Sequence, residues 1–474
     1  MQDVDLLPAS QGPTMRQQTP CFPKFKTGLT TILFALAAAI GGKAAVMKAG
    51  VARVDITPPV GTQMWGYFNR LKGAEGIIDP LYARVLVLEA GDERLAYVDL
   101  DLGRTFGPAS LGRLRQAARR QSGINALIVQ AIHTHAGPVI MDQYPSGTPA
   151  WETTDLGKIE QAIHQAQQSA VPVRLGTGYG IAYIGYNRRR VNPDGTITML
   201  WNNSARIPTW PVDPTVAVLR IDRMNGQPLA ILVNYACHPV TFGSDNLRYS
   251  ADFPGVMCKV VERAFGRKPL CFFMQGAAGD INVYDAGTPI KQDAVARRDW
   301  AGERLGHAAA RIAQKIQTEA DPNPSVDFAE DPLRLRLRWN PEKFRQETLR
   351  EIGARAFRIY SPPIHETMQV PVTTLLINRK IAMMGMPGEP FVQFQMDWRA
   401  RCPARDCFFL GYANGYFGYL PTVRAATEGG YGAANATTWL QVGAGDRMLN
   451  HALVRLDQML GRLPNDPHTG WKSR

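Results

Sequence analysis

Two histidine motifs come directly after apolar stretches that are typical of β-strands. His133 and His135 follow residues 126–132, and His238 follows residues 229–235. In an extended chain, side chains two positions apart point to the same face, so the imidazoles of His133 and His135 should lie together. Histidines placed in this way can bind a metal ion or transfer protons near neutral pH. His238 alone also fits an ordinary buried histidine at a sheet edge.

A carboxylate follows a third apolar stretch. Glu389 lies in a tight turn after the predicted strand 381–384. It could join the histidines, or it could stabilise the N-terminus of a helix that begins at Pro390, where negative charge is favourable. Tyr416 and Tyr419 lie in a glycine-rich segment, where aromatic side chains more often pack than react. Sites in α/β sheets form at the carboxyl ends of strands, so the histidines and Glu389 are candidates for one site.

The segments that must position these residues alternate between strand and helix patterns. Continuous apolar runs indicate strands covered on both faces, and apolar residues at helical spacing indicate amphipathic helices. This alternation predicts an α/β or mixed, sandwich-like core. The other predicted strands cover 50–57, 84–89, 95–102, 216–221, 270–275 and 373–378. The predicted helices cover 109–121, 156–170, 255–265, 292–319, 341–354, 390–401 and 446–460.

Two further segments are predicted to lack regular structure. Residues 201–214 are rich in Pro, Asn and Trp and should form a long surface loop, of the kind that often shapes the mouth of a substrate pocket. Residues 321–331 are polar and contain proline. We expect this second segment to link the main domain to the C-terminal third.

The overall composition is that of a packed globular protein. The chain has 474 residues, of which 45% are hydrophobic and 20% are charged, so disorder is not expected. Its length fits one large catalytic domain with insertions, or one domain with a small lobe. The net charge of +12 allows peripheral contact with an anionic membrane surface. The longest basic run is only residues 188–190, so we predict no nucleic-acid partner; the oligomeric state is not indicated.

The first 45 residues resemble a secretory signal peptide. Basic residues precede an apolar stretch at 32–40, and Gly42 and Ala44 supply the small residues that a signal peptidase reads. The apolar run is shorter than the roughly 20 residues that a membrane span needs. We therefore expect removal of residues 1–45, export to the periplasm or the medium, and a mature domain covering 46–474.

The cysteines favour packing over metal binding. Cys237, Cys258 and Cys271 fit as small buried residues. Cys402 and Cys407 are close enough in sequence to form a disulfide after export. No Cys-x-x-Cys pair is present, so a thiolate zinc site is not predicted.

Several motifs occur in the order found in the neutral/alkaline ceramidases. They are HTHAGP at 133–138, YACHP at 235–239, QGAAGD at 275–280, PGE at 387–389 and NGYFGY at 414–419. The chain therefore resembles the catalytic domain of this family from about residue 50 to residue 431. The resemblance implies an α/β, mixed-sheet metallohydrolase domain. The separate C-terminal immunoglobulin-like domain of the family is expected to be absent.

The resemblance also implies a metal centre. It makes His133, His238, Glu389 and Tyr419 the ligands of one zinc ion. His135 would lie beside the metal as an acid/base or oxyanion-stabilising group. Two imidazoles, a carboxylate and a phenolate suit zinc, which lowers the pKa of water towards neutrality and so supplies a nucleophile.

The same resemblance implies how the substrate is held. Arg188 is similar to the arginine near the family's substrate polar group. Gly66 is similar to the backbone donor in the pocket wall. Tyr431 is similar to the tyrosine that stabilises the developing oxyanion, a role that tyrosine and arginine donors can fill.

One position departs from the family pattern. In the ceramidases a serine follows the glutamine of the 275–280 segment, and Gly276 stands there, so no serine nucleophile is available at this position. We expect zinc-activated water to cut an amide (N-acyl) or ester bond in a small or lipid-like substrate other than ordinary ceramide. One alternative is a non-catalytic, metal-containing binding protein of the same fold. Another is a basic surface protein that binds anionic polymers.

Overall fold

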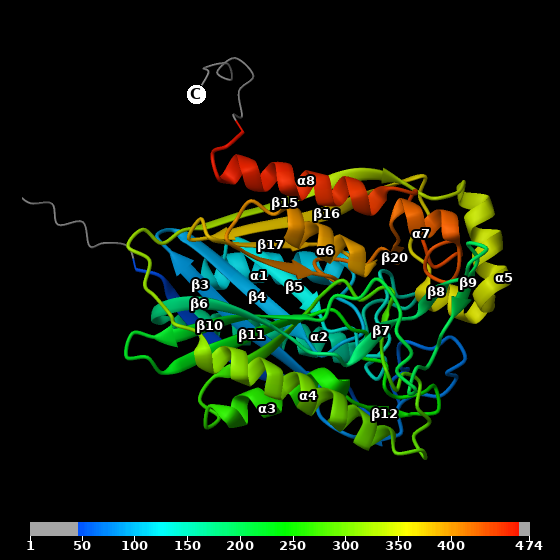
Figure 1. The fold of residues 1–474 in the computed structure, drawn as a ribbon, viewed down its shortest axis with the longest axis horizontal. Coiled ribbons are helices and arrows are strands. Elements are labelled where there is room, and N and C mark those ends of the chain that lie inside the picture. The colour runs from blue at the N-terminus through cyan, green and yellow to red at the C-terminus, as the bar shows by residue number, and fades with distance from the viewer. Residues whose placement is uncertain (1–45, 464–474) are drawn as a thin grey trace, which may run out of the picture. The chain divides into compact units, whose positions relative to one another are not determined.

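Two facing β-sheets with helices on both outer faces make up the protein. The computed structural model describes residues 46–463 (Figure 1). The predicted signal peptide lies outside the described residues. The mixed α/β, sandwich-like core predicted from the sequence is confirmed. Within residues 46–463, no helix is both long and apolar enough to cross a membrane.

The larger sheet has eight strands in the order β13-β11-β10-β6-β1-β3-β4-β5. Its central strands are antiparallel, and the pairs at its two edges, β11–β13 and β4–β5, are parallel. The strands are β1 Lys48–Asp55, β3 Tyr82–Ala90, β4 Glu93–Leu100, β5 Ala126–Ala131, β6 Val171–Ile181, β10 Thr215–Arg223, β11 Pro228–Tyr235 and β13 Leu270–Gln275. All were predicted except β6. Its apolar pattern is interrupted by Gly176, Gly178 and Gly180. Glycine is needed at these positions because a Cβ would lie within 2.8 Å of α4 side chains or of the chain that follows α4.

The smaller sheet has four strands in the order β15-β16-β17-β19. They are β15 Val326–Arg336, β16 Thr367–Ile377, β17 Ile381–Gly385 and β19 Asp406–Leu410. The prediction that 321–331 is a linker is wrong, because β15 begins at Val326 and pairs with β16 along its whole length. β15 is an edge strand, where charged residues and proline are tolerated. Its polar composition therefore reflects its place in the sheet.

Helices cover the outer faces of both sheets (Figure 1). The helices packed on the larger sheet are α1 Pro108–Ser122, α2 Ala150–Gln168, α3 Asp252–Ala264 and α4 Ala294–Lys315. Those on the smaller sheet are α6 Val392–Arg401 and α8 Ala444–Met459. The predicted helices are all present. Residues 201–214 contain no helix or strand, as predicted.

The remaining helices and short strands gather near one end of the sandwich (Figure 1). They include α5 Pro341–Tyr360, which is interrupted at Gly353, and α7 Val423–Glu428. The short strands are β2 Gly76–Ile77, β7 Gly185–Asn187, β8 Arg189–Val191, β9 Ile197–Met199, β12 Arg248–Tyr249, β14 Ile281–Val283, β18 Glu389–Pro390 and β20 Tyr419–Leu420.

The space between the two sheets is a continuous apolar core. Leu232 and Phe272 of the larger sheet belong to the same buried cluster as Met383 and Phe408 of the smaller one. Burying one such side chain stabilises the fold by about 1.5–3 kcal/mol. This core holds the sheets together and fixes where their strand ends lie.

The cysteines lie as expected except for the disulfide. Cys237, Cys258 and Cys271 are buried, as predicted. Cys402 and Cys407 are neighbours that share a hydrogen bond, and none of the cysteines in residues 46–463 forms a disulfide.

The larger sheet curls until its two edge strands approach each other. Gln130 of β5 donates from Nε2 to the carbonyl of Gln275 in β13 at 2.7 Å. Gln275 in turn donates from Nε2 to the carbonyls of Ile132 at 2.8 Å and Cys237 at 3.0 Å. Both glutamines are fully buried, so these bonds are made in a low-dielectric interior. The chain segments that follow β5, β11 and β13 therefore meet at one place.

Candidate active site

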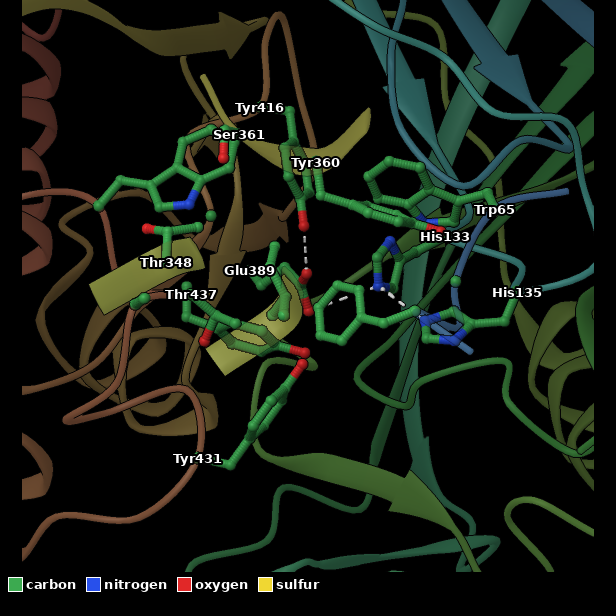
Figure 2. Close-up of a pocket in the computed structure, with 17 residues that line it drawn as sticks. Trp65, His133, His135, Thr348, Tyr360, Ser361, Glu389, Tyr416, Tyr431 and Thr437 are labelled. Atoms are coloured by element: carbon green, nitrogen blue, oxygen red, sulfur yellow. Dashed lines mark hydrogen bonds and ion pairs between the residues drawn. The ribbon is translucent and has the colours of Figure 1, made fainter. Parts of the chain in front are cut away.

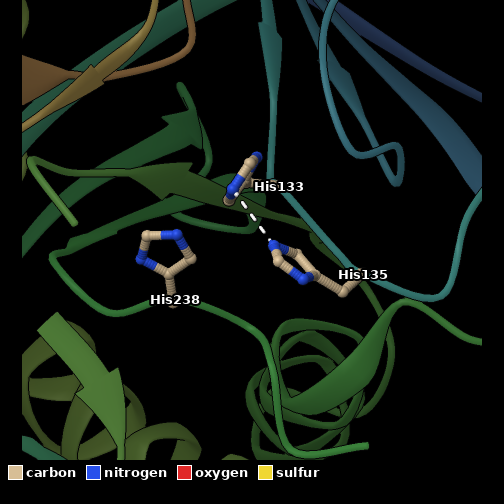
Figure 3. A group of neighbouring side chains, drawn as sticks. All are labelled: His133, His135 and His238. Carbon is tan, nitrogen blue, oxygen red and sulfur yellow. Dashed lines mark hydrogen bonds between the residues drawn. The ribbon is translucent and has the colours of Figure 1, made fainter. Parts of the chain in front are cut away.

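His133 leaves β5 through an uncommon backbone conformation. Its φ is 70°, in the left-handed region, so the predicted extended course of 133–135 is wrong. Such a conformation costs about 1–3 kcal/mol in a non-glycine residue and is often found at functional sites. The two rings nevertheless converge, as predicted, with the Nε2 atoms of His133 and His135 3.3 Å apart (Figure 3).

Backbone carbonyls set the protonation of two imidazoles. Nδ1 of His133 lies 2.5 Å from the carbonyl oxygen of Gly103, and Nδ1 of His238 is hydrogen-bonded to the carbonyl of Ala278. A carbonyl can only accept, so each Nδ1 carries a proton, and in the neutral ring Nε2 then presents a lone pair. A histidine that binds metal ordinarily donates its other ring N–H in this way.

The Nε2 atoms of His133 and His238 face one carboxylate. Oε2 of Glu389 lies 3.4 Å from Nε2 of His133 and 3.0 Å from Nε2 of His238. Burial lowers the pKa of His238 to about 4, so this ring is neutral at pH 7. Burial raises the pKa of the Glu389 carboxyl, but a proton on the imidazole of His133 or His238 would hold it well below its usual range. Two ring nitrogens and one carboxylate oxygen thus converge in a buried site.

Glu389 is also held from its other side. The hydroxyl of Tyr416 donates to Oε1 of Glu389 at 2.5 Å (Figure 2). Glu389 lies in β18, which pairs with β20 so that Glu389 stands opposite Tyr419. The fourth predicted ligand is therefore next to the third through backbone pairing.

His135 has a different environment from the other two histidines. Its Nδ1 is buried and has no hydrogen-bond partner. Burial, and next the neighbouring imidazoles of His133 and His238, lower its pKa well below the usual value. The ring packs against Gly66, where a Cβ would lie 2.5 Å from the His135 ring and φ is 105°. Only glycine fits there, so Gly66 lets the backbone approach the imidazole closely.

The three histidines together could hold a metal ion. Each offers one ring nitrogen, and these nitrogens lie within 4.8 Å of one another. Two donor sets are therefore available: His133 and His238 with Glu389, or the three histidines. Only His133 and His238 have the outer hydrogen bond that fixes a metal-binding tautomer, which favours the first set.

Arg188 and Tyr431 form a wall beside this centre. Arg188 is buried and donates to the carbonyl of Gly279 at 2.7 Å and to Oδ1 of Asn282 at 3.2 Å. Its guanidinium carbon lies 5.4 Å from the ring centroid of Tyr419 and 5.3 Å from that of Tyr431. The structure thus brings all the predicted site residues to one place.

Two cavities meet at the site. The first has a volume of about 50 Å³ and is lined by His133 and Glu389, together with residues of α5. The second has a volume of about 460 Å³ and is lined by Arg188, Trp201 and other residues. The lining that both share includes Gly66, His135, Tyr419 and Tyr431. His238 is fully buried and lines neither cavity.

Comparisons with known proteins identify the family of this chain. Residues 47–282 match the family described as neutral/alkaline non-lysosomal ceramidase, N-terminal. The chain belongs to this family. Neutral ceramidase B of Dictyostelium discoideum is 26% identical over 268 residues, which are 50% of this chain and 36% of that relative. The match thus spans little more than a third of the length of the Dictyostelium discoideum protein.

Solved ceramidase structures share the fold. The crystal structure of neutral ceramidase from Pseudomonas aeruginosa matches with a TM-score of 0.71 at 21% identity, over 89% of this chain and 76% of that one. A ceramidase complexed with C2 matches with a TM-score of 0.70 at 19% identity and the same coverage. The family resemblance and the fold expected from the sequence are both confirmed.

Several residues at this ceramidase-family site escaped the sequence analysis. Tyr416 was expected to pack, but it hydrogen-bonds Glu389. Tyr412 stacks on His133 with ring centroids 4.2 Å apart. Both lie in the glycine-rich segment that carries Tyr419, which was the available signal. Asn282 follows the QGAAGD motif, and nothing in its type or spacing marked it.

Packing explains the absence of a side chain at Gly276. It lines neither cavity, and a Cβ there would lie 2.2 Å from Oε1 of Gln395. That oxygen accepts a hydrogen bond from the amide of Ala277 at 3.0 Å, and Gln395 donates to Asp213 at 2.7 Å. Gly276 therefore makes room for an amide that holds the loop carrying Ala278. Its missing side chain gives no reason to expect altered substrate positioning.

Proposed function

We propose that this ceramidase-family chain is a zinc-dependent hydrolase of an amide or ester bond. The observation that carries the proposal is the meeting of His133, His238 and Glu389. Two imidazole nitrogens and a carboxylate oxygen that meet in a buried site form a donor set that a cation can complete. Neutral nitrogen and carboxylate ligands in this combination suit zinc.

His133, His238 and Glu389 would hold the ion, with Tyr419 as the fourth ligand. Zinc, when bound, supplies a Lewis acid that polarises a carbonyl and makes water acidic enough to attack at neutral pH. Tyr416 keeps the Glu389 carboxylate oriented through its 2.5 Å hydrogen bond. Gly103 and Ala278 keep the two imidazoles in the required tautomer through their carbonyls.

The residues of the wall would move the proton and bind the developing charge. His135 is neutral and has a ring nitrogen without a partner, so it can accept the proton of the attacking water and return it to the leaving group. Arg188 and Tyr431 are donors that can stabilise the oxyanion of an amide or ester under attack.

The test combines metal analysis with turnover. Purified protein should contain zinc and hydrolyse members of a panel of N-acyl compounds, lactones and simple esters. A chelator should abolish the activity, and added zinc should restore it. The matched control is His307→Ala, an exposed histidine on α4. Zinc without hydrolysis of any compound would instead make the chain a non-catalytic metal-binding protein.

A further inference from the structure

The two cavities that meet at the site differ about ninefold in size. The one on the α5 side holds about 50 Å³, and the one on the Trp201 side holds about 460 Å³. A scissile carbonyl carries one substituent on each side. His135 and Tyr431 line both cavities, so a carbonyl bound between them can direct one substituent into each cavity.

Packed aromatic rings limit the small cavity. Tyr360, at the end of α5, lies with its ring centroid 4.7 Å from that of Trp65 and 5.0 Å from that of Phe68 (Figure 2). On the other side, the ring of Tyr416 lies 5.6 Å from Trp65 and 5.5 Å from Trp439. Rings packed at these distances resemble a protein core, which resists expansion.

Tyr360 also approaches the site itself. Burial raises the pKa of its hydroxyl to about 12, and a hydrogen bond with the backbone amide of Gly66 opposes this rise. Gly66 lines both cavities, so Tyr360 stands where the small cavity begins. Ile352, one turn beyond Thr348 in α5, lines the same space.

We propose that this enzyme takes amides or esters in which one substituent of the carbonyl has no more than about four non-hydrogen atoms. A water-sized group needs roughly 10–15 Å³ of such space, so the small cavity holds about four of them. The larger substituent lies in the wide cavity, whose wall includes the apolar side chains of Val240 and Ala286. This inference rests on the hydrolase activity proposed above. Tyr360, which packs against Trp65 and Phe68 in the lining of the small cavity, limits the size of that cavity.

Two substrate series test the proposal. One varies the acyl chain of p-nitrophenyl esters from acetate to palmitate. The other keeps an acetyl group and varies the alcohol over the same lengths. We expect kcat/KM to fall at least about tenfold in one series once the varied group exceeds about four heavy atoms. The other series should change only a few fold.

Variants assign the limit to α5. Tyr360→Ala should move the cut-off to longer substituents, and Ile352→Ala, at a half-buried position, should do so to a smaller extent. Trp201→Ala in the wide cavity is the matched control and should leave the cut-off in place. Thermal melting would verify that each variant is folded.

The outcomes separate this inference from the proposed function. Equal turnover of short and long compounds in both series would overturn the length limit and leave the hydrolase intact. An unchanged cut-off in folded Tyr360→Ala and Ile352→Ala would also overturn it. Absence of metal-dependent hydrolysis in every compound would overturn the proposed function, and the length limit with it.

Discussion

Two parts of the site differ in how their polar atoms are paired. We call His133, His238 and Glu389 the floor, and His135, Arg188 and Tyr431 the wall. On the floor, the Nδ1 atoms of His133 and His238 and both oxygens of Glu389 have partners or near neighbours. On the wall, Nδ1 of His135 and Nε of Arg188 are buried without a hydrogen-bond partner. Buried polar groups are usually paired, so such exceptions need an explanation. Our proposed function assigns a cation to the floor and a substrate to the wall.

The largest expected effect comes from the floor. Glu389→Gln replaces the charged oxygen that faces both imidazoles by a neutral amide of nearly the same shape. We expect the purified variant to lose zinc and to hydrolyse no faster than chelated wild type. Elemental analysis and turnover of the best ester would measure this. Full zinc occupancy in this variant would remove Glu389 from the ligand set.

A wall variant should lose turnover without losing metal. Tyr431→Phe removes a hydroxyl that faces the oxyanion in our account. Removing one such donor lowers kcat by about 10²–10³. Zinc content should equal that of wild type, since Tyr431 is not a predicted ligand. A loss of zinc that parallels the loss of kcat would place this tyrosine on the floor instead.

The hydrogen bond from Tyr416 to Glu389 should strengthen metal binding. Tyr416→Phe keeps the ring between Trp65 and Trp439 but removes the donor to Oε1. Loss of such outer partners typically weakens metal binding about 10–100-fold. Competition with a zinc chelator of known affinity would measure the change. An unchanged affinity would show that the carboxylate is oriented without this tyrosine.

The smallest effect on activity is expected at Gly276. Gly276→Ala would force its Cβ against Gln395, and overpacking of this kind costs about 1–3 kcal/mol of stability. The free energy of unfolding from urea denaturation measures this cost. The control is Gly112→Ala in α1, where a Cβ meets nothing within 4 Å and stability should be unchanged or rise. Equal stability of the two variants would contradict the packing explanation.

Local pattern predicted most of the elements and much of the site. Continuous apolar runs gave β5, β11 and β17, and the chemistry-bearing residues follow their ends. Among the strands of the two sheets, β6, β15 and β19 were not predicted. The composition of β6 and β15 reflects their neighbours, because α4 packs on the glycines of β6 and β15 lies at an edge. The local sequence of a strand holds no information on either contact.

The proximity of residues that are distant in sequence could not be predicted from their types and spacing. β5 and β13 are opposite edges of the larger sheet, and only its curl brings His133 near the loop that holds His238. The family resemblance supplied that proximity without its cause. Tyr360 was missed altogether, because α5 shows only the ordinary pattern of an amphipathic helix and its position over the site depends on tertiary packing.

The most direct test compares His238→Ala with His135→Ala. Both remove one imidazole of the same cluster, but only His238 has its Nδ1 fixed by a carbonyl. The measurement is zinc per chain together with turnover. We predict that His238→Ala loses zinc, whereas His135→Ala keeps near one equivalent and loses about 10²–10⁴ in kcat. Loss of zinc in both variants would support the three-histidine site, and retention in both would contradict a metal centre on this floor.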